Sequence, residues 1–219
     1  MTDWRAHAKR EEGRFRDGEG RLPDAADADS RQRQLTRMGN AAAGAGLAYL
    51  MAGEEEAARE WFDRAVERYR ESFPLAPPGS WGRPIATIKA RVLAGDWDGA
   101  EAEARWALEQ GASAAESPIG RYAACLALLV LGRDQDARVV ADGLRTDADF
   151  PSAVGDALAF IAAEDVVGYA EAVELVLRSF ETREEYLEDL PVADTVIVLQ
   201  VLAGRRGMAA ELTSPLLPG

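Results

Sequence analysis

Apolar residues recur along most of the chain at intervals of three and four positions, which places them on one face of an α-helix. The clearest run follows Gly53, with apolar side chains at Ala58, Trp61, Phe62, Ala65, Val66 and Tyr69. No segment combines alternating apolar and polar residues with an Asn-Gly or Asp-Gly turn, the pattern of a β-hairpin. The hydrophobic pattern therefore predicts an all-α protein.

Short turns divide the predicted helices at regular intervals. The glycines that mark them lie 42, 37, 36 and 36 residues apart, at Gly53, Gly95, Gly132, Gly168 and Gly204. Glycine ends a helix readily because it tolerates the left-handed conformation, and acidic residues after it favour the start of the next helix. A period of this length predicts about five degenerate pairs of antiparallel helices, stacked in chain order.

The chain divides into an N-terminal segment, residues 1–29, and a single helical-repeat domain, residues 30–219. In the first segment we expect a helix near residues 4–15 and a loop over residues 17–29, which are rich in Gly and Asp. Residues 72–84 contain four prolines and two glycines and cannot be helical throughout. That segment accounts for the long interval of 42 residues between the first two marker glycines.

Small and aromatic residues stand at fixed intervals in the first unit, at Gly46, Tyr49, Gly53, Ala58, Phe62 and Ala65. The second unit keeps Gly95, Ala100, Ala107 and Leu108, and the third keeps Gly132 and Ala137. This spacing resembles the tetratricopeptide repeat over roughly residues 36–204. The first unit departs from the family pattern at Ala42 and Ala45, where large residues are usual, and the last two units are degenerate.

The resemblance implies a right-handed α-α superhelix in which the first helix of each pair lines a groove that binds another protein or peptide. It places on that groove Asn40, Leu47, Lys89, Tyr122, Leu126 and Asp194. Trp81, in the loop before the second pair, is a further candidate contact, since an exposed Trp can anchor a partner. Two alternatives stay open: Trp81 plugs the end of a helix pair, or another helix, such as the N-terminal one, fills the groove.

The composition leaves little room for catalysis. The chain has one His and one Cys, His7 and Cys125, so it can build neither a disulfide nor a structural zinc site. His7 lies near the chain end, and Cys125 lies in an apolar stretch where we expect a small core residue. We predict no enzyme activity, no cofactor and no metal. A hydrolase that uses carboxylates alone is a remote alternative, given the acidic pairs at residues 164–165, 184–185 and 188–189.

Two further segments have patterns that resemble ligand loops but lack their defining residues. Residues 39–46 are rich in Gly but lack the Lys of a phosphate-binding loop and follow no strand, so they predict close helix packing. Asp24, Asp27 and Asp29 lack the Gly and terminal Glu of a calcium loop. They predict a cap for the helix that follows.

The net charge of −13 is unevenly distributed. Residues 1–40 carry nine basic and eight acidic side chains, whereas residues 41–219 carry 16 and 30. This acidity argues against a nucleic acid as partner, because phosphate binding needs a basic face. It is explained equally by adaptation to high salt or by a GC-rich genome. The longest apolar stretch, residues 122–131, has ten residues, too few to cross a bilayer, so we expect a cytoplasmic protein without membrane contact.

The C-terminal end carries a second resemblance. Residues 192–202 predict an apolar helix, and residues 207–219 predict an extended tail that ends in Ser-Pro-Leu-Leu-Pro-Gly. A final helix followed by such a tail resembles the immunity protein 49 family, all-helical proteins that neutralise the enzymatic domain of a secreted toxin. This second resemblance covers only the last part of the chain.

Together these patterns predict a non-enzymatic scaffold or adaptor that binds another protein through tetratricopeptide-like repeats. An immunity protein that neutralises a polymorphic toxin is the alternative. The sequence leaves open the identity of the partner and the oligomeric state.

Overall fold

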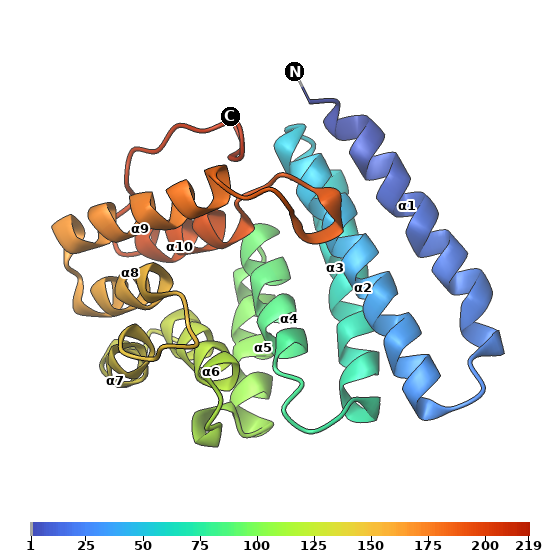
Figure 1. Ribbon diagram of the computed structural model, residues 1–219, viewed down its shortest axis with the longest axis horizontal. Coiled ribbons are helices and arrows are strands. Elements are labelled where there is room, and N and C mark those ends of the chain that lie inside the picture. The colour runs from blue at the N-terminus through green and yellow to red at the C-terminus, as the bar shows by residue number, and fades with distance from the viewer. Residues whose placement is uncertain (1) are drawn as a thin grey trace.

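The computed structural model describes residues 2–219, apart from the side chain of Leu187. It is all-α, as predicted: ten α-helices follow one another and the described residues contain no strand (Figure 1). Their bounds are α1 Trp4–Arg21, α2 Ala28–Met51, α3 Glu55–Ser72, α4 Gly82–Leu93, α5 Trp97–Glu109, α6 Pro118–Val130, α7 Asp134–Arg145, α8 Ser152–Ala163, α9 Val166–Glu181 and α10 Asp194–Gly204. None of these helices combines the length and the apolar character that a membrane span needs.

Helices α2 to α9 form a stack of four antiparallel hairpins, α2–α3, α4–α5, α6–α7 and α8–α9, in which each helix packs on the next in the chain. The first three hairpin turns have the predicted chemistry. Gly53, Gly95 and Gly132 are left-handed, with φ of 75°, 67° and 66°. After Gly95, the Asp96 carboxylate accepts a hydrogen bond from Gly99 N at 3.0 Å and caps α5.

The last two marker glycines differ from the prediction, because neither is the left-handed residue of a turn. The left-handed residue of the fourth hairpin is Glu164, with φ of 53°. Gly168 lies in the first turn of α9, where a Cβ atom would come within 2.7 Å of the Phe160 ring, so this glycine serves close packing. Gly204 is the last residue of α10, and the left-handed glycine after that helix is Gly207, with φ of 70°.

The N-terminal helix is longer than predicted. It continues to Arg21, so the loop before α2 covers only residues 22–27 rather than 17–29. Tertiary packing explains the extension, because Gly18 fits closely against the Met38 side chain of α2. Asp27 caps α2, as expected, and accepts from Ser30 N at 2.7 Å.

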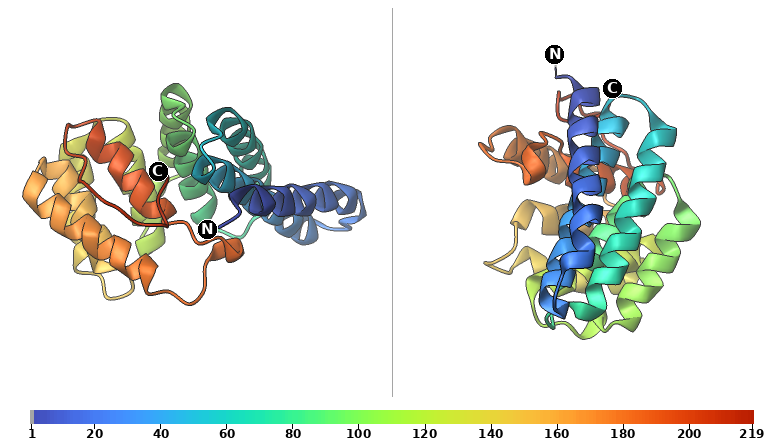
Figure 2. Two further views of the ribbon diagram at one scale, coloured as in Figure 1. Left: turned by 90° about the horizontal axis from the view of Figure 1, so that it is seen from above. Right: turned by 90° about the vertical axis from the view of Figure 1, so that its right-hand side faces the viewer.

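Helix α10 does not add a fifth hairpin but packs against α4, α8 and α9 (Figure 2). We call the face formed by α2, α4, α6 and α8, the first helices of the hairpins, the inner face. Helix α10 covers part of the inner face, whereas the N-terminal helix, α1, lies against α2 at the end of the stack. The physical reason is polarity: α10 is apolar on all sides and α1 is strongly polar. The buried residues of α10 are Val196, Val198, Leu199, Leu202 and Ala203.

The C-terminal tail follows α10 without regular structure and returns along it. Gln200 accepts from Ala210 N at 3.0 Å and donates to Ala210 O at 2.6 Å. Further on, Ala193 N donates to Leu216 O at 2.9 Å. These bonds hold the tail against the start and the middle of α10.

Candidate functional site

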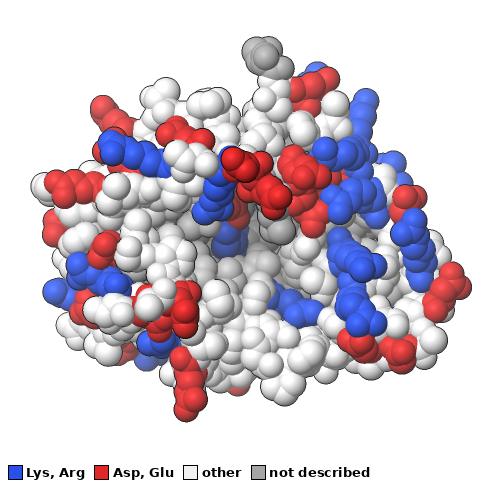
Figure 3. Space-filling view, viewed as in Figure 1, with Lys and Arg blue, Asp and Glu red and all other residues white. Residues whose placement is uncertain are grey.

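The segment between α9 and α10, residues 182–193, crosses the front of the molecule to α2 and then returns to α10 (Figure 1). We call this segment the strap. Behind it lies a cavity of about 250 Å³ on the inner face. Figure 3 shows this face hollowed at its centre, with acidic and basic side chains gathered along the upper edge and mainly uncharged atoms inside.

The two helices behind the cavity present short apolar side chains, which leave space between the helices and make the lining mainly apolar. On α2 these are Ala43 and Gly44, and on α4 they are Ala86 and Ala90. Phe62 of α3 closes the back, where Gly46 lets its ring approach so closely that a Cβ atom would come within 2.7 Å of it. The Gly-rich stretch of residues 39–46 therefore serves close packing, as predicted.

A polar cluster lies at the α2 edge of the cavity, around Glu188 of the strap. The Glu188 carboxylate is paired with Arg14 and accepts a hydrogen bond from Asn40 Nδ2 at 3.1 Å. The Glu188 carbonyl accepts from Arg10 Nη2 at 2.8 Å. On the other side of Asn40, Tyr69 OH donates to its Oδ1 at 2.9 Å. Residues from α1, α2, α3 and the strap thus meet at one point.

Burial raises the pKa of the Tyr69 phenol, and the Glu188 carboxylate nearby raises it further. The phenol therefore remains protonated and acts as a donor. Because its proton goes to the amide oxygen of Asn40, the amide nitrogen must face Glu188.

A second polar contact at the cavity joins α4 to the start of α10. Lys89 of α4 pairs with Asp194 at the start of α10, and Lys89 Nζ also lies 3.2 Å from Thr195 Oγ1. Arg183 stands at the mouth, with its guanidinium 3.7 Å from the centre of the Phe180 ring. Each of the two cavity carboxylates, Glu188 and Asp194, therefore has a cationic partner, Arg14 and Lys89 respectively.

The predicted groove residues separate into two groups. Asn40, Leu47, Lys89 and Asp194 all line the cavity. Leu126 has no exposed surface and belongs to the main core. It forms the second group with Tyr122 and Trp81, none of which lines the cavity.

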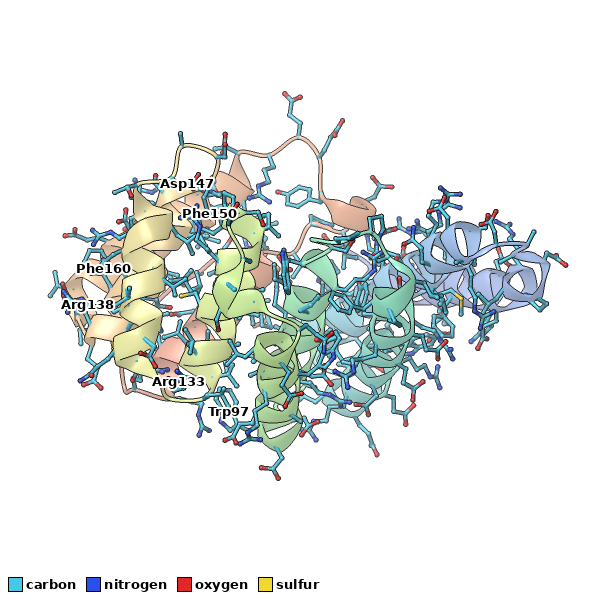
Figure 4. The ribbon with its side chains drawn as sticks, turned by 90° about the horizontal axis from the view of Figure 1, so that it is seen from below. Trp97, Arg133, Arg138, Asp147, Phe150 and Phe160 are labelled. Atoms are coloured by element: carbon cyan, nitrogen blue, oxygen red, sulfur yellow. The ribbon has the colours of Figure 1, made fainter. Side chains whose placement is uncertain are left out.

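Tyr122 and Trp81 pack within the fold. Tyr122 is 9% exposed and lies against Phe150, which Figure 4 shows beside Asp147 in the loop between α7 and α8. Its hydroxyl has no hydrogen-bond partner among residues 2–219. Trp81 is half-buried, and its indole contacts Phe73 and the start of α6 at Gly120. The packing of Trp81 is the one expected of a residue that plugs the end of a helix pair.

Four residues of the site were not predicted: Arg10, Arg14, Tyr69 and Glu188. The sequence pattern assigns Tyr69 only to the apolar face of its helix, and the acidic pair at residues 188–189 only to the remote alternative of a carboxylate hydrolase. Arg10 and Glu188 are separated by 178 positions, so no local pattern could indicate their contact. The described residues contain no group of His, Cys, Asp and Glu side chains placed to hold a metal ion.

Comparisons with family models, with curated proteins and with solved structures found no match to this chain. The fold places it in the class of all-α proteins built from stacked helices, and the site is an apolar cavity with a polar edge.

Proposed function

We propose that this protein is a non-enzymatic binding module, a tetratricopeptide-like helical repeat that receives part of a partner protein in the cavity beneath the strap. The observation that carries the proposal is the cavity of about 250 Å³ itself, which lies on the inner face between the first helices of two hairpins. Stacked helical hairpins characteristically bind their partners along such a face.

The dimensions of the cavity favour a peptide over a free small molecule. Sites for small molecules are generally about 300 to 1,000 Å³ and enclose most of their ligand. This cavity is smaller and only partly enclosed, so it suits one or two apolar side chains of an incoming chain. The polar groups at its rim, Asn40 and Lys89, then remain beside the backbone of that chain.

Site-specific photo-cross-linking in the native host tests the proposal. A photoreactive diazirine amino acid with a side chain no larger than that of leucine, placed at Ala86 inside the cavity, should cross-link one discrete partner, identified by mass spectrometry. The same amino acid at Val139, which is 75% exposed on α7, is the matched control and should not. Filling the cavity with Ala43→Trp should then weaken binding of that purified partner about tenfold or more.

Two outcomes would count against the proposal. One is the same set of products from both cross-linking positions. The other is unchanged affinity in an Ala43→Trp variant whose circular dichroism shows that it is folded.

The charge distribution favours a second candidate, an immunity protein. Residues 76–219 carry 12 basic and 23 acidic side chains, whereas residues 1–75 carry 13 and 15. A strongly acidic surface is suited to a basic toxin domain, which it would attract electrostatically. This candidate predicts that a toxin gene with a variable C-terminal domain lies beside the gene for this chain. It also predicts that the protein inhibits that domain when the two are mixed; housekeeping neighbours and no inhibition would exclude it.

A further inference from the structure

Arg14 and Asn40, which hold the Glu188 carboxylate, form a binding site for a carboxylate, and Arg10 holds the adjacent backbone carbonyl. Glu11 of α1 has no exposed surface and lies against α2, where a Cβ atom on Gly44 would come within 3.1 Å of its Cγ. Its two oxygens accept hydrogen bonds from Arg10 Nε at 2.9 Å and from Arg14 Nη1 at 3.0 Å. The buried carboxylate of Glu11 thus positions two guanidinium groups.

These contacts do not depend on the strap. Tyr69 orients the amide of Asn40, and Glu11 orients Arg10 and Arg14, all through residues of α1, α2 and α3. Two guanidinium groups and one carboxylate leave a net charge of +1 at this site. One further carboxylate neutralises it, and Arg and Asn donors are well suited to bind that group.

Glu188 fills the site from a backbone conformation that residues other than glycine rarely adopt. It is left-handed, with φ of 58°, and the next residue, Asp189, is left-handed as well, with φ of 54°. Strain of this kind persists where surrounding contacts hold it, and it is frequent in switch regions. A carboxylate from another chain could reach the same donors without that strain.

We propose that Arg14 and Asn40 bind an acidic side chain of the partner protein, with Arg10 donating to a backbone carbonyl beside it, and that Glu188 occupies this site in its place until the partner displaces it. The inference rests on the proposed function and specifies the partner chemistry. The recognised segment holds a Glu or Asp beside an apolar residue, because the carboxylate site adjoins the apolar cavity. Displacement of Glu188 releases the strap and opens that cavity.

The experiment uses the strap sequence itself as the probe. A fluorescent peptide that copies residues 182–193 is titrated into the full-length protein and into three variants, with binding followed by anisotropy. In the wild type the tethered strap competes at a high effective concentration, so the peptide should bind weakly. Glu188→Ala empties the carboxylate site and should strengthen peptide binding about tenfold or more.

Two variants serve as controls. Glu185→Ala removes an exposed strap carboxylate that makes no hydrogen bond or ion pair with the residues that the structure describes, and it should leave the affinity at the wild-type value. Adding Arg14→Met to Glu188→Ala should remove the gain. A peptide in which the Glu that corresponds to Glu188 is replaced by Gln should also bind the Glu188→Ala variant more weakly.

Equal affinity for the wild type and for Glu188→Ala would overturn the inference, and so would a gain that persists in the presence of Arg14→Met. Circular dichroism and thermal unfolding verify that each variant is folded. The cross-linking test at Ala86 is independent of these titrations. If Ala86 cross-links a partner and Glu188→Ala has no effect, the binding function stands and this inference fails. If the reverse is found, the carboxylate site stands and the proposed function fails.

Discussion

The inner face of the helical stack is covered in two different ways along its length. Towards the C-terminal end, α10 packs against α4, α8 and α9 and buries an apolar surface. Towards the N-terminal end, the strap crosses in front of α2 and α4 and leaves a cavity of about 250 Å³ behind it. A helix that is apolar on all sides fills the space it enters, whereas a polar segment is held at the rim by charge pairs and hydrogen bonds.

The difference separates a region that supports the fold from one that is suited to binding. Most of the buried apolar side chains of α4 to α10 belong to one continuous core, whereas α1, α2 and α3 contribute to smaller clusters. Segments with few buried apolar contacts open most easily, and proteins commonly draw their binding elements from them. The predictions below test this contrast, from the largest expected effect to the smallest.

The packed half should be sensitive to the loss of side-chain volume. Leu199 of α10 has no exposed surface, and Leu199→Ala should lower the free energy of unfolding by about 2 to 5 kcal/mol through lost burial and the cavity left behind. Leu175→Ala is the matched control, because Leu175 of α9 is 52% exposed, and it should change stability by no more than about 0.5 kcal/mol. Urea unfolding measures both. If Leu199→Ala lowers the free energy of unfolding as little as Leu175→Ala does, α10 is not part of the core.

Added volume should distinguish the two halves directly. Ala123 of α6 is completely buried in the main core, and Ala123→Leu should cost about 1 to 3 kcal/mol through overpacking. Ala86 of α4 lines the cavity, so Ala86→Leu should cost almost nothing or slightly stabilise the protein. The comparison requires the same denaturant titration for both variants. Equal costs at the two positions would contradict the presence of usable space beneath the strap.

The pair that connects the two halves, Lys89 with Asp194, should contribute modestly. Lys89→Met leaves Asp194 without its cation and should lower the free energy of unfolding by about 1 to 2 kcal/mol, since both side chains are largely but not completely buried. Adding Asp194→Leu should recover part of this loss, because both charges are then absent. A double-mutant cycle measures the coupling. Purely additive losses would show that the two side chains do not interact.

The smallest expected effect is a dependence on pH in the alkaline range. Burial raises the pKa of the Cys125 thiol from its ordinary value of 9.0 to about 12. Well below pH 9 the thiol is protonated in both states and has no effect. Between pH 9 and 10 the thiol ionises in the unfolded chain but not in the folded protein, so this group should lower the stability as the pH rises, by about 1 kcal/mol over that pH unit.

Chemical unfolding at several pH values compares this decline in the wild type and in Cys125→Ala, which should fall less steeply. Native Cys125 should also resist thiol reagents until the protein unfolds, because it has no exposed surface. Rapid labelling of the folded protein would contradict the burial of α6.

Local features of the fold could be predicted because they depend on neighbours in the chain. Gly53, Gly95 and Gly132 end helices as expected, since a helix terminus needs only a residue that tolerates left-handed geometry. The same reasoning failed at Gly168, because a glycine that ends a helix and one that admits an aromatic ring have the same local signature. Phe160, which contacts Gly168, distinguishes the two only after the helices have packed.

The candidate site could be predicted only in part. Asn40 and Lys89 follow from their positions on the first helices of two hairpins, and the structure places both at one cavity. Their partners could not be predicted, because Glu188 and Asp194 lie 148 and 105 residues further along the chain. The left-handed conformation of Glu188 was equally unpredictable, since it follows from contacts with α1 and α2.

The sequence by itself determined that the chain forms helices, where most of them end, and that they pair in chain order. These properties arise from hydrogen bonds and apolar spacing within a few turns of helix. Only the tertiary structure decided that α10 fills one half of the inner face and that Glu188 closes the edge of the other. Those outcomes depend on which surfaces fit and which charges meet between helices and segments that pack together only in the folded protein, and local spacing carries no record of them.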